Sequence, residues 1–322
     1  MSVKAVLSCC LMFIVLKYII VDVDGGPARR PKKKKITSYP HVYYKDQLPR
    51  FRGGKPSYYK RIPHTYFETV YDTKNKLPVY SAYMLYKWKK EYGRVDGWKT
   101  DPQLLKEEQP KTTDFKDIAG QQLNGGHLYP QFYNSREENK IETNFVTNIA
   151  LQYKNFNQNT WLRLENALYK VANTMCNFRR AKRQFITGVV PSKTKFSKKG
   201  LNIPESFWTA VCCDTSQALA RGKQADGWSF VYIIKNQKPD VKSRNVEMYF
   251  VDDFVKQPFS PFVTLFGNIE GVRSCLFNEN RVVDVVKRVI ELNGRRDRFY
   301  LKGKLNTLYE NSLKQKQKKR NN

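Results

Sequence analysis

Residues Phe145–Met175 read FVTNIALQYKNFNQNTWLRLENALYKVANTM, and they join two different sequence patterns. The opening run FVTNIALQ is rich in β-branched and apolar side chains and predicts a short strand. From Asn157 onward apolar residues recur at helical spacing, on a stripe made of Trp161, Leu164, Leu168, Val171 and Met175. The stretch therefore predicts a strand followed closely by a helix with one buried face.

The rest of the chain supplies further strands and one more helix, in clusters. Residues 65–88 contain two β-rich runs separated by the turn-like Asp72–Lys76, which is a hairpin signature. Residues 280–292 are amphipathic at helical spacing and stop before Gly294, as a helix should. Because strands and helices do not alternate strictly, the predicted fold class is α+β with an antiparallel sheet and packed helices. Further strands are expected within residues 184–191, 203–214 and 228–236.

The first 25 residues have the features of a secretory signal peptide. Lys4 supplies a positive start, residues 5–16 form an apolar or small run of 12, and Gly25 ends a small-residue cleavage site. The alternative is an uncleaved signal anchor, because Lys17 is followed by the apolar YIIV and the basic run Arg29–Lys35 opposes translocation. We expect a secreted protein.

Composition divides the mature chain into three parts. Residues 26–61 are basic, aromatic and rich in Pro and Gly, and they predict an extended arm that is ordered only if something packs on its tyrosines. Residues 62–300 are expected to form one folded domain. Residues 301–322 end in KQKQKKRNN and predict a solvated basic tail.

Charge is the strongest bulk signal in the 322 residues. Lys and Arg total 58 against 29 Asp and Glu, which gives a formal net charge of +29. Such an excess favours a polyanionic partner, because each phosphate that a protein neutralises releases a counterion. Nucleic acid is the expected partner, and anionic lipid, glycan or simple solubility are the alternatives.

Cysteine usage fits an oxidising compartment. After signal cleavage the chain keeps Cys176, Cys212, Cys213 and Cys275. Four cysteines predict two disulfides, with three possible pairings, whereas buried free thiols are the alternative. Their spacing lacks the paired CxxC and the histidines of a zinc site.

Three polar residues could together cleave a phosphodiester. His127, in a turn-like LNGGHLYP stretch, could act as a general base, because a neutral imidazole works near pH 7. Asn157 and Glu165 lie eight positions apart on the predicted helix, roughly 80° apart around its axis, so both can face one cavity. A carboxamide oxygen suits Mg²⁺, which keeps several waters. Taken singly, His127 could be a loop residue, Asn157 a helix cap, and Glu165 an exposed helix position.

The order of these motifs resembles the DNA/RNA non-specific endonuclease family. In that family a DRGH motif is followed by TNxxPQ and then by N-x(3)-W-x(3)-E, and here GHLYP is followed by TNIALQ and NFNQNTWLRLE. The segments YDTKNKLPVYSAY, WKTDPQL, FITGVVPS and IPESFWTAVCC are similar to the endonuclease domain-containing 1 branch. The resemblance covers residues 65–264, about two thirds of the chain, and makes residues 62–300 an endonuclease-like domain.

The resemblance implies a fold and a set of roles. The fold is an α+β ββα-metal (His-Me finger) core on an antiparallel sheet. The general base falls on His127, the direct metal ligand on Asn157, and the metal-supporting glutamate on Glu165. The TN asparagine falls on Asn148 as a further catalytic residue, and the glutamine of TNxxPQ falls on Gln152. The implied cofactor is Mg²⁺, with Mn²⁺ as an alternative ion, and the implied substrates are DNA and RNA.

The motif departs from the family in front of the histidine. DRGH is NGGH here, so Asn124 replaces the aspartate and Gly125 replaces an arginine that would offset phosphate charge. Losing such a donor costs roughly 10²–10³ in rate by analogy with oxyanion-hole deletions. Arg94 lies two positions from where the family places a phosphate-binding arginine, and it is the expected catalytic substitute. Arg163 and the cluster Arg179–Arg183 are other candidates, although both could simply reflect the general basicity.

Two functions remain open at this point. The first is a secreted, metal-dependent endonuclease that hydrolyses DNA and RNA, with activity weakened by NGGH. The second is a catalytically impaired nuclease fold that binds nucleic acid or another polyanion. Contact through the phosphate backbone is expected in both, without a stable membrane partner, and the sequence leaves the oligomeric state open.

Overall fold

The computed structural model describes residues 41–86, 93–115, 120, 122–220, 223–224, 226–238, 244–267, 275, 278–294 and 296–321. The predicted signal peptide and the first part of the predicted arm lie outside these residues. Over the described residues 100–115 the regular elements are the short 3-10 turns Lys106–Glu108 and Thr112–Phe115.

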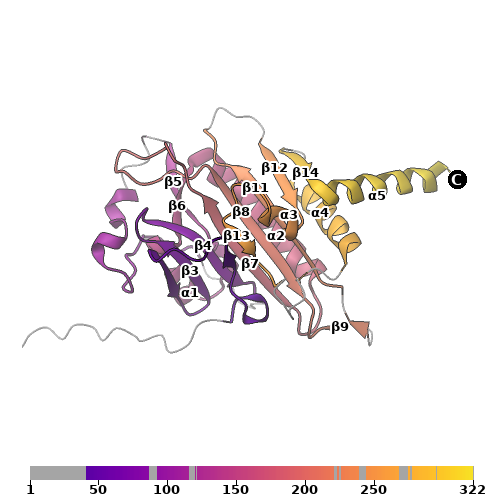
Figure 1. Cartoon of the computed structure of the whole chain (residues 1–322), viewed down its shortest axis with the longest axis horizontal. Helices are drawn as coiled ribbons and strands as arrows, with labels where there is room; N and C mark the ends of the chain where they lie inside the picture. Colours follow the sequence, from indigo (N-terminus) through magenta and orange to yellow (C-terminus); the bar gives the residue numbers. More distant parts are fainter. Residues whose placement is uncertain are drawn as a thin grey trace, which may run out of the picture. The chain divides into compact units, whose positions relative to one another are not determined.

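A central eight-stranded sheet organises the described chain (Figure 1). Its strand order is β14-β12-β11-β8-β7-β4-β3-β2, so sequential hairpins account for most neighbouring pairs. The strands are β2 (Tyr59–Pro63), β3 (Phe67–Asp72), β4 (Leu77–Met84), β7 (Lys182–Val190), β8 (Ser206–Asp214), β11 (Trp228–Lys235), β12 (Asn245–Tyr249) and β14 (Arg298–Leu301).

Local sequence explains most of this sheet. The hairpin predicted over residues 65–88 is confirmed as β3 and β4. Strands β8 and β11 lie within the predicted segments 203–214 and 228–236, whereas β7 begins two residues before the predicted segment 184–191. Every residue of β8 is buried. A strand that is buried throughout must have both faces of its sheet covered, because successive side chains point to opposite faces.

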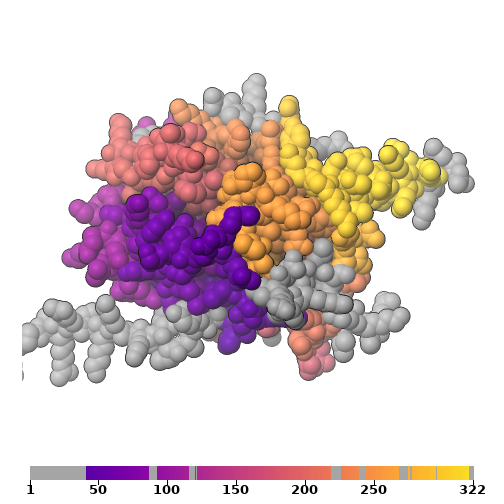
Figure 2. Space-filling model, viewed as in Figure 1, coloured from indigo at the N-terminus to yellow at the C-terminus, as the bar shows by residue number. Residues whose placement is uncertain are grey.

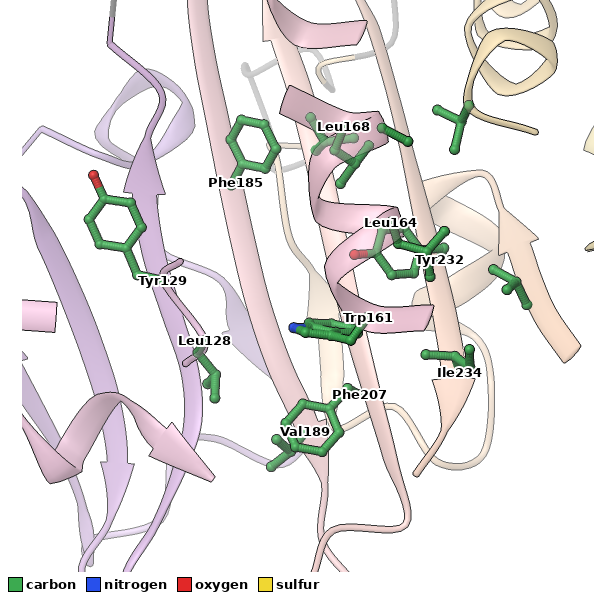
Figure 3. Close-up of a cluster of buried hydrophobic side chains, with 14 of the residues drawn as sticks. Leu128, Tyr129, Trp161, Leu164, Leu168, Phe185, Val189, Phe207, Tyr232 and Ile234 are labelled. Atoms are coloured by element: carbon green, nitrogen blue, oxygen red, sulfur yellow. The ribbon is translucent and has the colours of Figure 1, made fainter. Parts of the chain in front are cut away.

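Two hydrophobic cores cover the two faces. On one face α2 (Leu162–Met175) and α4 (Glu279–Asn293) pack on the sheet, and Figure 3 shows Trp161, Leu164 and Leu168 beside Phe207 and Tyr232. On the other face lie the N-terminal residues Val42–Tyr44, α3 (Val251–Val255) and β13 (Phe262–Thr264). Neighbouring residues of one strand divide between the cores, as Phe207 and Trp208 do.

Residues 123–175 contain a strand–strand–helix unit. β5 (Leu123–His127) pairs antiparallel with β6 (Ile149–Tyr153), and the chain then enters α2. The prediction of a turn at LNGGHLYP is wrong for Leu123–His127, because backbone pairing with β6 holds these residues extended. The predicted strand and helix are confirmed, and the predicted α+β class with a ββα core is confirmed with them.

One pair departs from the predicted antiparallel sheet. β14 runs parallel to β12. Between them the chain passes through α3, β13 and α4, and parallel neighbours require such a crossover. The α4 helix ends at Gly294 with φ 72°, the left-handed conformation that glycine adopts at a helix end.

The two ends of the described chain are more ordered than their composition indicates. Val42, Tyr43 and Tyr44 are buried, and the Tyr43 hydroxyl donates to the Glu68 carboxylate at 2.7 Å. β1 (Arg50–Phe51) pairs with β13, and Figure 2 shows the indigo N-terminal segment against the orange one. The boundary expected at residue 62 falls inside β2. At the other end, α5 (Gly303–Asn321) forms a helix through most of the expected tail.

Shorter elements complete the described chain. They are α1 (Glu137–Thr143), the pair β9 (Leu219–Ala220) and β10 (Lys223–Gln224), a π-helical turn at Phe156–Trp161, and 3-10 turns at Tyr44–Asp46, Lys106–Glu108, Thr112–Phe115, Gln131–Tyr133 and Val146–Asn148. Across the described ranges, no helix combines the length and apolar composition needed to cross a membrane.

Two disulfides form from the four cysteines. Cys176 pairs with Cys213, and Cys212 pairs with Cys275. Cys212 and Cys213 are consecutive in β8, so their side chains point to opposite faces and belong to different cores. Cys213 therefore reaches the end of α2, whereas Cys212 reaches the segment that precedes α4 on the other face. Strand alternation selects this pairing from the three that the sequence allows.

We expect non-reducing peptide mapping of the purified protein to recover these two linkages. Replacing the first pair, in Cys176→Ser/Cys213→Ser, should lower the free energy of unfolding by about 2–4 kcal/mol, because the bridge closes a loop of 37 residues. Urea denaturation measures this change. A bridge between Cys176 and Cys212 would contradict the face assignment.

Candidate active site

A cavity of about 530 Å³ lies beside β5, β6 and the start of α2. Its walls include His127 from β5, Gln152 from β6, Asn157 from the π-helical turn and Glu165 from α2. These residues were predicted from separate motifs, and pairing of β5 with β6 brings them onto one cavity. Arg94 also lines it.

A network of side-chain amides fixes the proton on His127. The Val95 N–H donates to Gln131 Oε1 at 2.9 Å, which leaves Gln131 Nε2 to donate to Asn144 Oδ1 at 2.9 Å. Asn144 Nδ2 donates to the Val95 carbonyl at 3.0 Å, so Asn144 Oδ1 can only accept. His127 Nε2 lies 2.9 Å from that oxygen and must donate to it. The neutral ring therefore carries its proton on Nε2 and has an unprotonated Nδ1.

The environment keeps the His127 ring neutral. Burial lowers the pKa of His127 to about 4, the Asn144 hydrogen bond acts in the opposite direction, and the charge of Arg94 lowers it further. A neutral imidazole with a bare Nδ1 can accept a proton from water. His127 thus has the form of a general base in the absence of substrate.

Asn157 sits in a turn that is wider than a regular helix. Phe156–Trp161 form a π-helical turn, so the 80° separation from Glu165 expected for an α-helix does not apply. Both side chains nevertheless line the same cavity. Asn157 Nδ2 lies 3.5 Å from the Gly125 carbonyl, whereas Oδ1 has no hydrogen bond with the described residues. The carboxamide oxygen is therefore available to a ligand.

Glu165 is a buried carboxyl without a cationic partner. Its residue is 9% exposed, and no Lys, Arg or His of the described chain forms an ion pair with it. Burial raises the pKa of Glu165 to about 8, and the neighbouring Trp161 acts in the opposite direction. Among the described residues no ion pair offsets the cost of burying the Glu165 carboxylate form.

Asn148 and Gln152 differ in their position relative to the cavity and in their hydrogen bonding. Asn148 is buried outside the cavity wall, and its amide bonds Ser81, the Tyr129 backbone and the Thr143 carbonyl at 2.8–3.2 Å. That position supports the strands and does not reach the cavity. Gln152 lines the cavity, and neither atom of its buried amide has a hydrogen-bond partner.

The candidate arginines fall in different places. Arg94 is exposed, pairs with Asp96 at 2.9 Å and lines the cavity. Arg163 Nη2 lies 2.8 Å from the Asp297 carboxylate, so its charge is committed to a structural ion pair. Within the cluster Arg179–Arg183, Arg183 is buried and donates to the Cys176 carbonyl at 3.1 Å, and no member of the cluster lines the cavity. The structure leaves Arg94 as the arginine of this set that lines the cavity.

Four lining or supporting residues were not found from the sequence. Asn144 and Gln131 orient His127, Lys140 of α1 lines the cavity and donates to the Gly93 carbonyl at 3.1 Å, and Trp98 packs on β5. Their contacts join segments far apart in the chain, so periodicity carries no sign of them. The WKTDPQL segment that contains Trp98 was the one available signal.

The oxygen set suits a hydrated hard cation. One cavity is lined by the Asn157 carboxamide, the Glu165 carboxyl and the Gln152 amide, which has no hydrogen-bond partner among the described residues. No cluster of three or more His, Cys, Asp or Glu side chains occurs in the part of the chain that the structure covers. An ion held here by these few protein oxygens would keep several waters.

Comparison with known proteins places these residues in context. Residues 49–259 match the family model described as DNA/RNA non-specific endonuclease. The Endonuclease domain-containing 1 protein of Homo sapiens is 25% identical over 225 residues, which cover 63% of this chain and 41% of that protein. The Salivary endonuclease of Lutzomyia longipalpis is 27% identical over 177 residues, which cover 46% of this chain and 42% of that protein.

The chain spans about two fifths of the length of these relatives. Among solved structures, the crystal structure of the EndoG/EndoGI complex is similar with a TM-score of 0.46 and 19% identity. That similarity covers 58% of this chain and 79% of the other.

The raised pKa of Glu165 predicts a pH dependence of stability in EDTA. The carboxyl is neutral in the folded protein up to about pH 8, whereas its ordinary value is 4.5. Its contribution to stability is thus fully present below pH 4.5 and is lost as the pH rises through 8. We expect the free energy of unfolding to fall by up to about 1.4 kcal/mol per pH unit in this window.

Urea titrations of the wild type and Glu165→Gln at several pH values check this expectation. The glutamine variant cannot ionise, so the difference between the two proteins should grow between pH 5 and 8. A constant difference would show that Glu165 ionises normally in the folded protein.

Proposed function

The chain belongs to the DNA/RNA non-specific endonuclease family, and from this we propose that it is a metal-dependent endonuclease that hydrolyses DNA and RNA. One observation carries the proposal: a histidine with a bare Nδ1 shares a cavity with an available carboxamide oxygen and an unpaired buried carboxyl. These are a base and two oxygen ligands for one cation.

In the proposed reaction His127 accepts a proton from the attacking water. Asn144 Oδ1 then stabilises the imidazolium through the Nε2–H hydrogen bond that is already formed. The low pKa of the free ring suits a base that is unprotonated before substrate arrives, and a bound phosphodiester adds negative charge that raises it.

Asn157 and Glu165 would hold Mg²⁺, or Mn²⁺, with Gln152 close by on the same cavity. Such an ion supplies positive charge to the phosphoryl oxygens. Glu165 must release its proton when the cation binds, because a protonated carboxyl is a poor ligand. The unpartnered Gln152 amide can bond a coordinated water or a phosphate oxygen.

The partners follow from charge. A net charge of +29 favours contact with the phosphate backbone of DNA and RNA, independent of sequence. We further propose that the protein is secreted, since the two disulfides suit an oxidising compartment. A stable membrane partner is not part of this proposal.

A second candidate function is binding of nucleic acid or another polyanion without efficient cleavage. The observation that favours it is NGGH, since Gly125 provides no cation beside His127. The two functions share the cavity and differ in whether bond cleavage follows binding.

Incubation of supercoiled plasmid and of RNA with the purified protein, in Mg²⁺ or in EDTA, tests the endonuclease. We expect nicking in Mg²⁺ and none in EDTA, and a loss of about 10²–10⁴-fold in rate for His127→Ala, as for removal of a catalytic base. His41→Ala is the matched control, because His41 is exposed and does not line the cavity. Equal gel shifts by the wild type and His127→Ala, with no nicking by either, would support binding instead.

Arg94 is the proposed replacement for the missing arginine. Arg94→Ala should lower kcat about 10- to 100-fold with little change in KM, since an exposed cation is partly screened compared with a buried donor. Arg288→Ala is the control, because Arg288 is also exposed and paired with an acid but lies outside the cavity. Similar kcat values for the two variants would leave Arg94 without a catalytic role.

A further inference from the structure

The space in front of Gly125 is filled by the indole of Trp98. A Cβ at position 125 would lie 2.9 Å from Trp98 Cζ2 and 3.0 Å from Ile149 Cγ2. Any side chain larger than hydrogen at this position would have to displace the ring. A cation on residue 125 and the present position of Trp98 therefore exclude each other, and an aromatic face takes the place beside His127.

Hydrogen bonds hold the backbone on both sides of Trp98. The Lys99 N–H donates to the Asn144 carbonyl at 3.0 Å, and the Val146 N–H donates to the Lys99 carbonyl at 2.8 Å. On the other side of Trp98, Val95 is bonded by Gln131 and Asn144. The residues that orient His127 thus also fix the segment that carries the indole.

The ring is arranged as part of the cavity wall. Trp98 is only partly buried, lines the cavity, and lies 5.2 Å from the His127 ring between centroids. Phe132 and Leu162 line the same cavity and are 39% and 41% exposed, so they add apolar surface to its wall. Arg94 lines it too and supplies positive charge.

Aromatic faces beside cations are the means by which proteins hold unpaired nucleotides. Bases stack on the rings, and the cations follow the phosphates. A base within a duplex has both faces covered by its neighbours and must leave the stack to reach such a ring, which costs free energy. A single strand or a loop offers its bases without that cost.

We propose that Trp98 is a stacking surface for a nucleobase next to the scissile phosphate, and that the site prefers unpaired nucleotides over duplex. This inference rests on the proposed function for its substrate class. It makes Trp98 a specificity-determining residue that contacts the base and does not take part in proton transfer.

The test measures binding without cleavage, using proteins that carry His127→Ala in EDTA. Fluorescence anisotropy compares three labelled 12-nucleotide probes of one sequence: a single strand, the same strand with abasic sites, and a blunt duplex. We expect the His127→Ala protein that retains Trp98 to bind the single strand about tenfold more tightly than the abasic strand. Trp98→Leu should bind the two strands equally, and Trp98→Phe should keep most of the preference.

Phe196→Leu is the matched control, since Phe196 is 53% exposed and lies outside the cavity. It should leave all three affinities unchanged. The stacking role is overturned if Trp98→Leu lowers the affinity for the abasic strand or the duplex as much as the affinity for the single strand. That result would mean that Trp98 only supports the cavity.

Photocrosslinking keeps the inference testable if Trp98→Leu does not fold. A single strand that carries 5-iodouracil, irradiated with the otherwise unchanged protein, should crosslink to Trp98 in a mass-spectrometric map. A crosslink confined to residues outside the cavity overturns the inference. An absence of plasmid nicking would instead contradict the proposed hydrolysis. Base-dependent binding in EDTA would still test the stacking role of Trp98.

Discussion

The buried amide of Asn148 joins the nuclease-like unit to the central sheet. Its oxygen accepts from Ser81 of β4 and from the Tyr129 backbone, while its nitrogen donates to the Tyr129 and Thr143 carbonyls. Removing this amide would take a partner from each of these groups, at about 1–3 kcal/mol for each one left buried and unsatisfied. Ser81 would keep its hydrogen bond to the Thr69 hydroxyl at 2.8 Å. Because Tyr129 is two residues beyond His127, this amide also fixes where β5 ends. Asn148 thus supports the frame of the unit and does not line the cavity.

Burial drives the two titratable groups of the cavity toward their neutral forms. It lowers the pKa of His127 and raises the pKa of Glu165, so neither group is charged near pH 7 in the free protein. Desolvation penalises the charged form of each group. A bound cation would offset that penalty for the Glu165 carboxylate, and a bound phosphate would offset it for the His127 imidazolium.

The departure from DRGH changes the wall of the cavity as well as its charge. Trp98 packs where a side chain on residue 125 would lie. The indole can occupy this position because residue 125 is a glycine and carries no side chain. Gly126 has a similar constraint, because a Cβ there would lie 1.9 Å from Gln152 Oε1. The two glycines let a tryptophan and a glutamine approach opposite faces of β5 closely. The unpartnered amide and the aromatic face both depend on that approach.

The sequence by itself determined the elements whose signals are local. Apolar periodicity gave α2, α4 and the β3–β4 hairpin, and the ordered motifs identified His127, Asn157 and Glu165 as one set. Tertiary structure decided what depends on distant partners. Pairing with β6 holds Leu123–His127 extended where a turn was expected. The ion pair with Asp297 holds Arg163 away from the cavity, and the hydrogen bond to Asn144 sets the tautomer of His127. These interactions join residues far apart in the chain. The spacing of apolar residues within one segment cannot predict which distant side chains the sheet brings together.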